Sequence, residues 1–434
     1  MTDPADSVLI EGQKEKVRQG LSRRLRAERR FRAYGVVAIV LAILMLLFLA
    51  GTIAANGYSA FYQTWIKVDV FLDAELIAPD GKTDPQTLRE DGDFRGALIE
   101  SLIASYRVRG REKENRLVAM FSTDAERTLQ RHVIANPQLI GRTVSIWVKA
   151  SSDIDQLTKG AIRRDLPESG RKVKDVQLAW YDRMEQGGRI ETRFNTGFFS
   201  TGDSREPEQA GIWGAIVGSF LTMLVTLILA FPVGLAAAVY LEEFAPKNRL
   251  TDLIEVNINN LAAVPSIVFG LLGLAVFLNF FELPRSAPLV GGMVLALMTL
   301  PTIIIAARAS LLAVPPSVRE AALGLGASRV QVVSHHVLPL AMPGILTGTI
   351  IGMARALGET APLLMIGMVA FIVDIPGGPT DASTVMPVQI YLWADSPERG
   401  FVEKTSGAVI VLLAFLVVMN ASAVYLRKKF ERRW

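Results

Sequence analysis

Long apolar segments constrain this chain more than any other feature of its sequence. A helix of roughly 20 apolar residues is long enough to cross about 30 Å of hydrocarbon. Hydrophobic residues make up 50% of the 434 residues, and most are concentrated in such segments. Six segments reach the required length, at about 33–55, 212–241, 253–281, 287–312, 340–373 and 405–426. The sequence therefore predicts a multi-pass membrane protein with an all-α membrane part.

Clusters of basic residues next to these segments predict their orientation. Residues 1–32 and 427–434 are both rich in lysine and arginine. Because basic residues accumulate on the cytoplasmic side, we expect a basic cytoplasmic arm at one end and a cytoplasmic tail at the other. Both ends can lie in the cytoplasm only with an even number of spans, which six satisfies. The first segment has too long a basic region and apolar run for a typical cleaved signal peptide, so we expect a retained span. The expected location is the bacterial inner membrane.

The second feature is a long polar insertion after the first span. Residues 56–211 are charged and mixed in character, with no spanning segment, and the predicted topology places them outside the cytoplasm. About 150 residues are enough for an independent core. A β-rich run at 143–148 and a helix-like run at 96–106 favour an α+β domain. Residues 200–210 are predicted to link it back to the membrane part at 212–426.

The composition also excludes several functions. The chain has no cysteine and three histidines, so disulfides, thiol catalysis and a histidine-based metal cluster are not expected. We expect no cofactor, no metal and no nucleic-acid partner, since the basic residues lie beside apolar segments. No G-x-x-x-x-G-K-[ST] motif is present, so this chain is not expected to hydrolyse ATP or to be an enzyme.

The predicted cytoplasmic loop between the fourth and fifth spans has strong helix signals. Ser317 and Glu320 form an S-x-x-E pattern that predicts a helix start. Gly326 can adopt the left-handed conformation that ends a helix. Ser328 and Gln331 then form an S-x-x-Q pattern, which predicts a second helix. The loop should therefore be a compact hairpin of two short helices.

This loop, residues 313–340, resembles the E-A-A-x3-G-x9-I-x-L-P loop of ABC importer permeases. His336 stands where that family has isoleucine. The resemblance implies that the loop docks into a groove on an ATP-binding subunit and transmits its closure to the membrane helices. The matching residues are Glu320, Ala321, Ala322, Gly326, Leu338 and Pro339.

A pair of opposite charges lies inside the fifth apolar segment. Arg355 and Glu359 are four residues apart, so they should share a helix face, with a tilt, kink or break near 358–362. Placing a charged side chain in the hydrocarbon region of a membrane costs free energy, so such side chains normally face the protein interior or a water-filled cavity. They could be a structural ion pair, or a site where arginine binds a tetrahedral oxyanion and the carboxylate accepts a hydrogen bond from a protonated oxyanion such as phosphate. Thr360 could donate a hydroxyl to the same anion or could serve helix packing.

The run R-A-L-G-E-T-A-P-L-L resembles the corresponding segment of the phosphate-specific permeases of the PstA type, and the similarity extends over about 212–426. It implies a type I ABC importer permease core of six transmembrane helices, with an inserted extracytoplasmic α+β domain as in longer PstA subtypes. It implies that Arg355 and Glu359 belong to the phosphate path. The partners it implies are a PstC-like permease, two PstB-like ATP-binding subunits, a periplasmic PstS-like phosphate-binding protein and membrane lipid.

Other functions remain open at this stage. The same class of importer could carry sulfate, molybdate or phosphonate. A membrane sensor could also join a first span to an outer domain, but it would usually have fewer spans and a cytoplasmic signalling domain. A passive channel would not need the docking loop.

Overall fold

The computed structural model describes residues 4–430. The chain forms two compact units, one up to Ala55 and one from Asn56 onward. Helix α1 (Pro4–Gly57) makes the first unit up to Ala55, and it continues without interruption from the basic arm through the predicted first span. Its apolar side chains are exposed in this unit; Phe48, for example, is 78% exposed. A helix of this length and composition can span a membrane.

A three-stranded antiparallel sheet organises the domain that follows. Its strands are β1 (Tyr62–Phe71), β2 (Thr143–Lys149) and β3 (Ile190–Phe194), in the order β2-β1-β3. The central strand pairs Val68 with Ile146 and Ile66 with Ile190. Because side chains alternate along a strand, Ile66, Val68 and Val70 lie together on its buried face.

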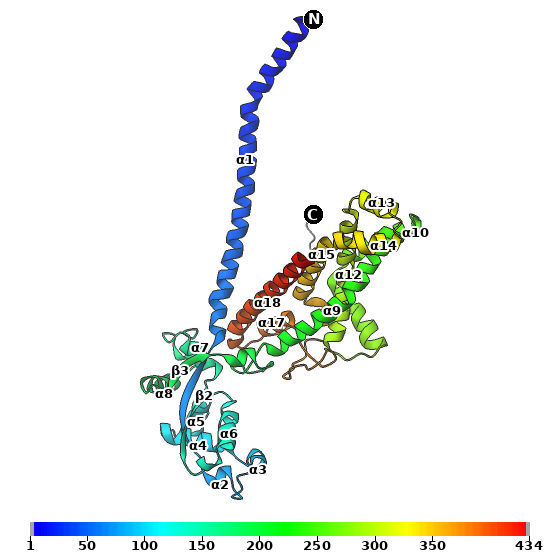
Figure 1. Cartoon of the computed structure of the whole chain (residues 1–434). Helices are drawn as coiled ribbons and strands as arrows, with labels where there is room; N and C mark the ends of the chain where they lie inside the picture. Colours follow the sequence, from blue (N-terminus) through cyan, green and yellow to red (C-terminus); the bar gives the residue numbers. More distant parts are fainter. Residues whose placement is uncertain (1–3, 431–434) are drawn as a thin grey trace. The chain divides into compact units, whose positions relative to one another are not determined.

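Helices pack against this face and close the core of the domain (Figure 1). They are α4 (Phe94–Tyr106), α5 (Arg111–Val118), α6 (Ala125–Ala135), α7 (Ser152–Thr158) and α8 (Asp175–Gln186), with the shorter α2 (Ala74–Ile77) and α3 (Pro85–Glu90). The predicted helix at 96–106 lies within α4, and the predicted strand at 143–148 lies within β2. The α+β prediction is therefore confirmed.

The linker is a packed loop. Ala210 and Ile212, at its end, are fully buried against the membrane domain. Trp393 Nε1 donates a hydrogen bond of 2.9 Å to Asp203 Oδ1, and burial raises the pKa of that carboxyl. Trp393 lies in the short helix α17 (Met386–Ala394). The linker is thus held by apolar and polar contacts.

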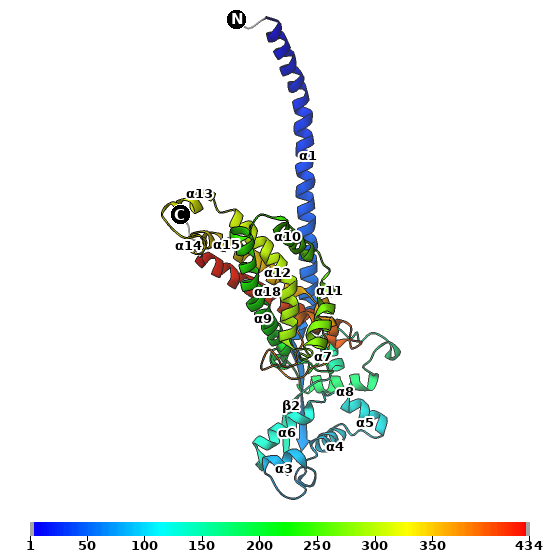
Figure 2. The same ribbon diagram turned by 90° about the vertical axis from the view of Figure 1, so that its right-hand side faces the viewer.

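Long apolar helices build the membrane domain. They are α9 (Trp213–Val239), α12 (Pro288–Leu312), α15 (Leu338–Gly358) and α18 (Gly400–Phe430). The central helix α12 packs against α9 and α15, as both views show (Figure 2). A Cβ on Gly292 would lie 2.5 Å from Val225, and one on Gly348 only 2.1 Å from Ala306. Glycine is required at both crossings because the backbones approach so closely.

The third predicted span is not a straight helix. Helix α10 (Arg249–Ala262) and helix α11 (Ser266–Leu272) with its π-helical continuation meet at an angle of 103°. Pro265 lies between them; it lacks an N–H donor and disfavours helical backbone at Val264. In the described part of the chain, five helices are long and apolar enough to span a membrane, or six if this bent pair counts as one.

The predicted break in the fifth segment is confirmed. Helix α15 ends at Gly358, and the short helix α16 (Ala361–Met365) begins three residues later with Pro362 in its first turn. The segment after α16 runs without a helix to Met386. The segment 340–373 is therefore one spanning helix followed by a short helix and a loop.

Candidate functional site

The predicted cytoplasmic loop folds as a helical hairpin. Helix α13 (Pro316–Gly324) leads through a turn to α14 (Arg329–Gln331), which continues as a π-helical segment (Val332–Val337) into α15. Gly326 has a φ of +88° and makes the turn. Gln331 N–H donates to Ser328 Oγ at 3.3 Å, and Ser328 N–H donates to Gln331 Oε1 at 2.8 Å. The prediction for the turn and the second helix start is confirmed.

The first predicted helix start was wrong. Pro315 occupies the N-cap position and Pro316 the first helical position, with no side-chain cap. Proline is favoured there because its fixed φ matches the helix and its missing N–H needs no partner. Ser317 therefore lies inside the helix, where its side chain does not cap the N-terminus.

Ion pairs hold the hairpin and α12 to neighbouring helical segments, and the hairpin is joined to the π-helical segment (Tyr240–Phe244) that follows α9. Arg319 Nη2 lies 2.7 Å from Glu243 Oε1, and the same guanidinium donates to the carbonyls of Val314 and Leu311. In α12, Arg308 lies 3.4 Å from Glu242 and 2.7 Å from Glu255. Arg308 thus binds two carboxylates. Reasoning from the sequence missed Arg319, although the adjacent acids Glu242 and Glu243 were a signal.

The hairpin presents apolar side chains at its turn. Leu325 is 90% exposed, and it is flanked by Leu323 at 49% and Val330 at 64%. We call these three residues the hairpin tip. Exposed large apolar side chains gathered in this way are typical of surfaces that contact another protein or a membrane.

The docking residues predicted from the family motif all lie in or directly after this hairpin. Glu320, Ala321 and Gly326 are exposed, whereas Ala322 is buried in its core. Leu338 and Pro339 are partly buried at the start of α15.

Gly326→Ala should open the hairpin locally. Left-handed backbone costs an L-residue about 1–2 kcal/mol, and nothing lies within 4 Å of the added Cβ, so the cost is conformational alone. Hydrogen exchange of backbone amides at 316–331 should then speed up by roughly 5–30-fold. Gly324→Ala is the matched control, because its Cβ also meets nothing and its φ is not positive. Equal exchange in the two variants would contradict this prediction.

The charged pair of the fifth segment lies at the break. Arg355 Nε is 3.6 Å from Glu359 Oε1, an ion pair too long for a hydrogen bond. Glu359 has extended backbone as the C-cap of α15, so it is not on a helix face as predicted, although the pair still forms. Thr360 caps α16, and its carbonyl accepts from Leu363 and Leu364 N–H.

Arg355 faces away from the packed side of α15. Met353, Ala356 and Leu357 are buried against neighbouring helices, whereas the Arg355 side chain is 53% exposed and that of Glu359 is 20% exposed. A guanidinium that faces the hydrocarbon of a membrane is unfavourable. Its exposed side therefore belongs against another protein surface or a water-filled path. Among the described residues, no three His, Asp or Glu side chains gather as metal ligands.

Comparison with known families defines the class of protein. Residues 230–434 match the family described as binding-protein-dependent transport system inner membrane component. Residues 18–168 match a domain of unknown function (DUF3333). The C-terminal half is thus the membrane component of an importer, and the extra domain has no assigned role.

Relatives narrow this class. Phosphate transport system permease protein PstA 1 of Mycobacterium tuberculosis is 31% identical over 229 residues, covering 52% of this chain and 74% of that protein. PstA of Pasteurella multocida is 30% identical, covering 50% and 76%. The probable ABC transporter permease protein YqgH of Bacillus subtilis is 31% identical, covering 50% and 73%. This chain belongs to the PstA family of ABC importer permeases.

Solved structures of importers are more distant. An inward-facing MetNI methionine ABC transporter is 18% identical with a TM-score of 0.40, covering 51% of this chain and 98% of that chain. An amino acid ABC transporter crystallised with histidines is 21% identical with a TM-score of 0.37, covering 51% and 92%.

Proposed function

We propose that this chain carries inorganic phosphate across the bacterial inner membrane, as one permease subunit of an importer driven by ATP hydrolysis on partner subunits. The relatives named PstA support phosphate as the cargo. The observation that carries the proposal is Arg355, a half-exposed guanidinium on a spanning helix, beside Glu359 at the helix break. No covalent chemistry is assigned to this chain.

The proposed path lies between this chain and a second permease subunit of the PstC type. Arg355 can bind a tetrahedral oxyanion through paired hydrogen bonds. Glu359 can accept a hydrogen bond from the P–OH group of a monohydrogen or dihydrogen phosphate, and it repels sulfate, which has no proton at neutral pH. Thr360 can add a hydroxyl donor. Because Arg355 points away from its own bundle, the partner permease would complete the site.

Coupling to ATP can follow one continuous helical segment. From Arg329 to Gly358 the chain is helical for 30 residues, through α14, the π-helical segment and α15. At about 1.5 Å per residue this spans roughly 45 Å. The second helix of the hairpin is therefore the start of the helical segment whose other end carries Arg355. A displacement of the hairpin by PstB-like ATP-binding subunits would move α15 and change access to Arg355.

The proposed topology completes the assembly. Both ends of the chain lie in the cytoplasm, and residues 56–211 lie outside, where a periplasmic PstS-like protein would deliver phosphate. Six spans fit this arrangement if the bent pair α10–α11 crosses once. The basic arm 1–32 and tail 427–434 are cytoplasmic in this proposal.

Arg355→Gln should reduce phosphate uptake about tenfold or more, since a hydrogen bond to a charged group contributes roughly 1.5–3 kcal/mol. Uptake of radiolabelled phosphate is measured in cells without their own high-affinity importer, with the neighbouring transporter genes expressed together. Arg285→Gln, an exposed arginine in the loop before α12, is the control and should transport normally.

Two outcomes would contradict the proposal in different ways. If the Arg355→Gln protein assembles and transports at the native rate, Arg355 is not on the path. If excess sulfate or molybdate abolishes uptake by the native protein, the importer class stands and another oxyanion is the cargo.

A further inference from the structure

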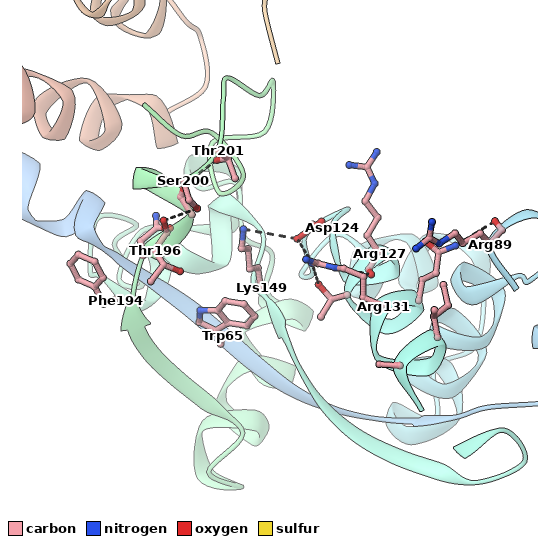
Figure 3. Close-up of a pocket in the computed structure, with 16 residues that line it drawn as sticks. Trp65, Arg89, Asp124, Arg127, Arg131, Lys149, Phe194, Thr196, Ser200 and Thr201 are labelled. Carbon is pink, nitrogen blue, oxygen red and sulfur yellow. Dashed lines mark hydrogen bonds and ion pairs between the residues drawn. The ribbon is translucent and has the colours of Figure 1, made fainter. Parts of the chain in front are cut away.

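The outer domain contains a pocket that no known role explains. Its volume is about 800 Å³. All three strands contribute to its walls, with Trp65 from β1, Lys149 from β2 and Phe194 from β3 (Figure 3). Helix α6 closes one side, and Arg89 of α3 extends the wall. The pocket is therefore built from the strands and helices of the folded domain.

The lining of this pocket is strongly basic. The lining contains four cationic side chains and one carboxylate, Asp124, which leaves three positive charges without a counter-charge in the lining. The cationic residues are Arg89, Arg127, Arg131 and Lys149. Neutral hydrogen-bonding side chains complete it: Thr128, Gln130, Asn195, Thr196, Ser200 and Thr201.

The single carboxylate is shared and loosely held. Asp124 Oδ2 lies 4.0 Å from Lys149 Nζ and 4.0 Å from Arg131 Nη2, and Figure 3 shows both cations directed at it. These separations exceed hydrogen-bond length. The side chains of Lys149 and Asp124 are only 15% and 18% exposed, so solvent screens them less than a surface pair.

The remaining arginines have no such partner. In the described part of the chain, no carboxylate lies within 4.0 Å of the Arg89 or Arg127 guanidinium, since neither forms an ion pair. Arg127 and Arg131 are also four residues apart on α6, and like charges at that spacing repel. A bound anion would remove this repulsion.

A second cavity of about 630 Å³ continues from the first. It shares Arg127, Lys149 and Asp124 and adds Arg205 together with the carboxylates Asp203 and Asp374. Its far wall is the loop 371–375 that follows α16 in the membrane domain. Arg205 stacks over Phe371 at 5.4 Å. The charges of this second cavity balance, so the excess of positive charge belongs to the first pocket beside the sheet.

We propose that this pocket binds a phosphate-class oxyanion outside the cytoplasm, an inference that rests on the proposed function for the choice of anion. Arginines match a tetrahedral oxyanion geometrically and retain their charge at any physiological pH. The same chemistry is offered by free inorganic phosphate and by the phosphate of an anionic lipid headgroup. The pocket is distinct from the Arg355 site, since the two share no residue.

Hydrogen exchange on the full permease complex in nanodiscs tests this proposal locally. Inorganic phosphate is added in zwitterionic lipid, and a second arm replaces part of that lipid with phosphatidylglycerol. When the phosphate concentration is ten times its dissociation constant, the exchange of backbone amides through locally opened states should slow about tenfold in residues 124–135 and 194–204. The Arg127→Gln/Arg131→Gln variant should lose this protection. Arg111→Gln, an exposed arginine of α5 outside the pocket, should keep it.

Each outcome decides the proposal. Protection by inorganic phosphate in zwitterionic lipid identifies the free anion, and protection only with phosphatidylglycerol identifies the headgroup. The proposal that the pocket binds an anion is overturned if neither arm shows protection, or if the double variant is protected as strongly as the native protein. Protection that persists in Arg355→Gln shows that the pocket binds its anion independently of the transport path. The pocket and the transport path can therefore be tested separately, even if one of the two proposals fails.

Discussion

Lys159→Met is expected to destabilise the second compact unit by about 3–5 kcal/mol, because it leaves two buried carboxylates without their shared cation. Lys159 Nζ lies 2.6 Å from Asp155 of α7 and 2.9 Å from Glu403 of α18. The three side chains are 10%, 4% and 12% exposed. Both carboxylates are fixed by other bonds, since Asp155 accepts from Thr64 N–H and Glu403 from the Ser59 hydroxyl. They cannot easily turn toward water when the lysine is removed.

Lys172→Met is a matched control. Lys172 also joins a carboxylate of α7, Asp153 at 3.7 Å, to one near α18, Glu398 at 2.9 Å. Its side chain is 43% exposed, so the loss should be at most about 1 kcal/mol. The two lysines thus make the same kind of bridge at different depths.

The measurement is the temperature at which the detergent-solubilised permease loses its monodisperse elution peak. Lys159→Met should lower it by about 5 °C or more relative to Lys172→Met. Adding Glu403→Gln to Lys159→Met should recover part of the loss, because one uncompensated charge is removed. Equal midpoints for the two single variants would show that burial of the Lys159 bridge contributes nothing.

Local features were predictable from the sequence. The apolar segments, the turn at Gly326 and the capping pair Ser328–Gln331 depend on residues close together in the chain. The charges Arg355 and Glu359 are four residues apart, so their meeting followed from spacing even though Glu359 lies just past the helix end. The bend at Pro265 was harder, because prolines within spanning helices are often tolerated; Pro232 and Pro301 lie inside intact helices.

Contacts across long sequence separations could not be predicted from the same patterns. The basic pocket gathers Trp65, Lys149 and Phe194 from three strands, and it exists only because the sheet has the order β2-β1-β3. The Lys159–Glu403 bridge joins residues 244 positions apart. Neither the pocket nor this ion pair leaves a periodic signal in the local sequence. Strand order and the docking of the outer domain on a helix are set by the packing of the whole unit.

The second large effect is expected at the hairpin tip, where Leu325→Asp should prevent assembly with the ATP-binding subunits. Leu325 is 90% exposed and lies between two other exposed apolar side chains. If the tip inserts into a groove, an unpaired carboxylate there is desolvated at a cost of several kcal/mol. The affinity should then fall by about 100-fold or more, and phosphate uptake should stop. Co-purification of the ATP-binding subunits measures the first effect and radiolabelled uptake the second.

Ser317→Asp adds the same charge to the same hairpin away from the tip. Ser317 is exposed in the first turn of α13, where a carboxylate is favoured by the helix dipole, so assembly and uptake should be unchanged. Assembly of Leu325→Asp at native affinity would reject the tip as the docking surface.

Arg355→Gln gives the complementary result, because it should keep the ATP-binding subunits bound and still lose uptake. The two substitutions lie near opposite ends of the region from α13 to α15, so they separate energy input from substrate passage. The helical segment from Arg329 to Gly358 would pass the movement of the hairpin to the Arg355 site. Transport then requires Arg355 as well as an intact hairpin. ATP hydrolysis that persists without uptake in Arg355→Gln is the expected signature of a coupled complex with a disabled path.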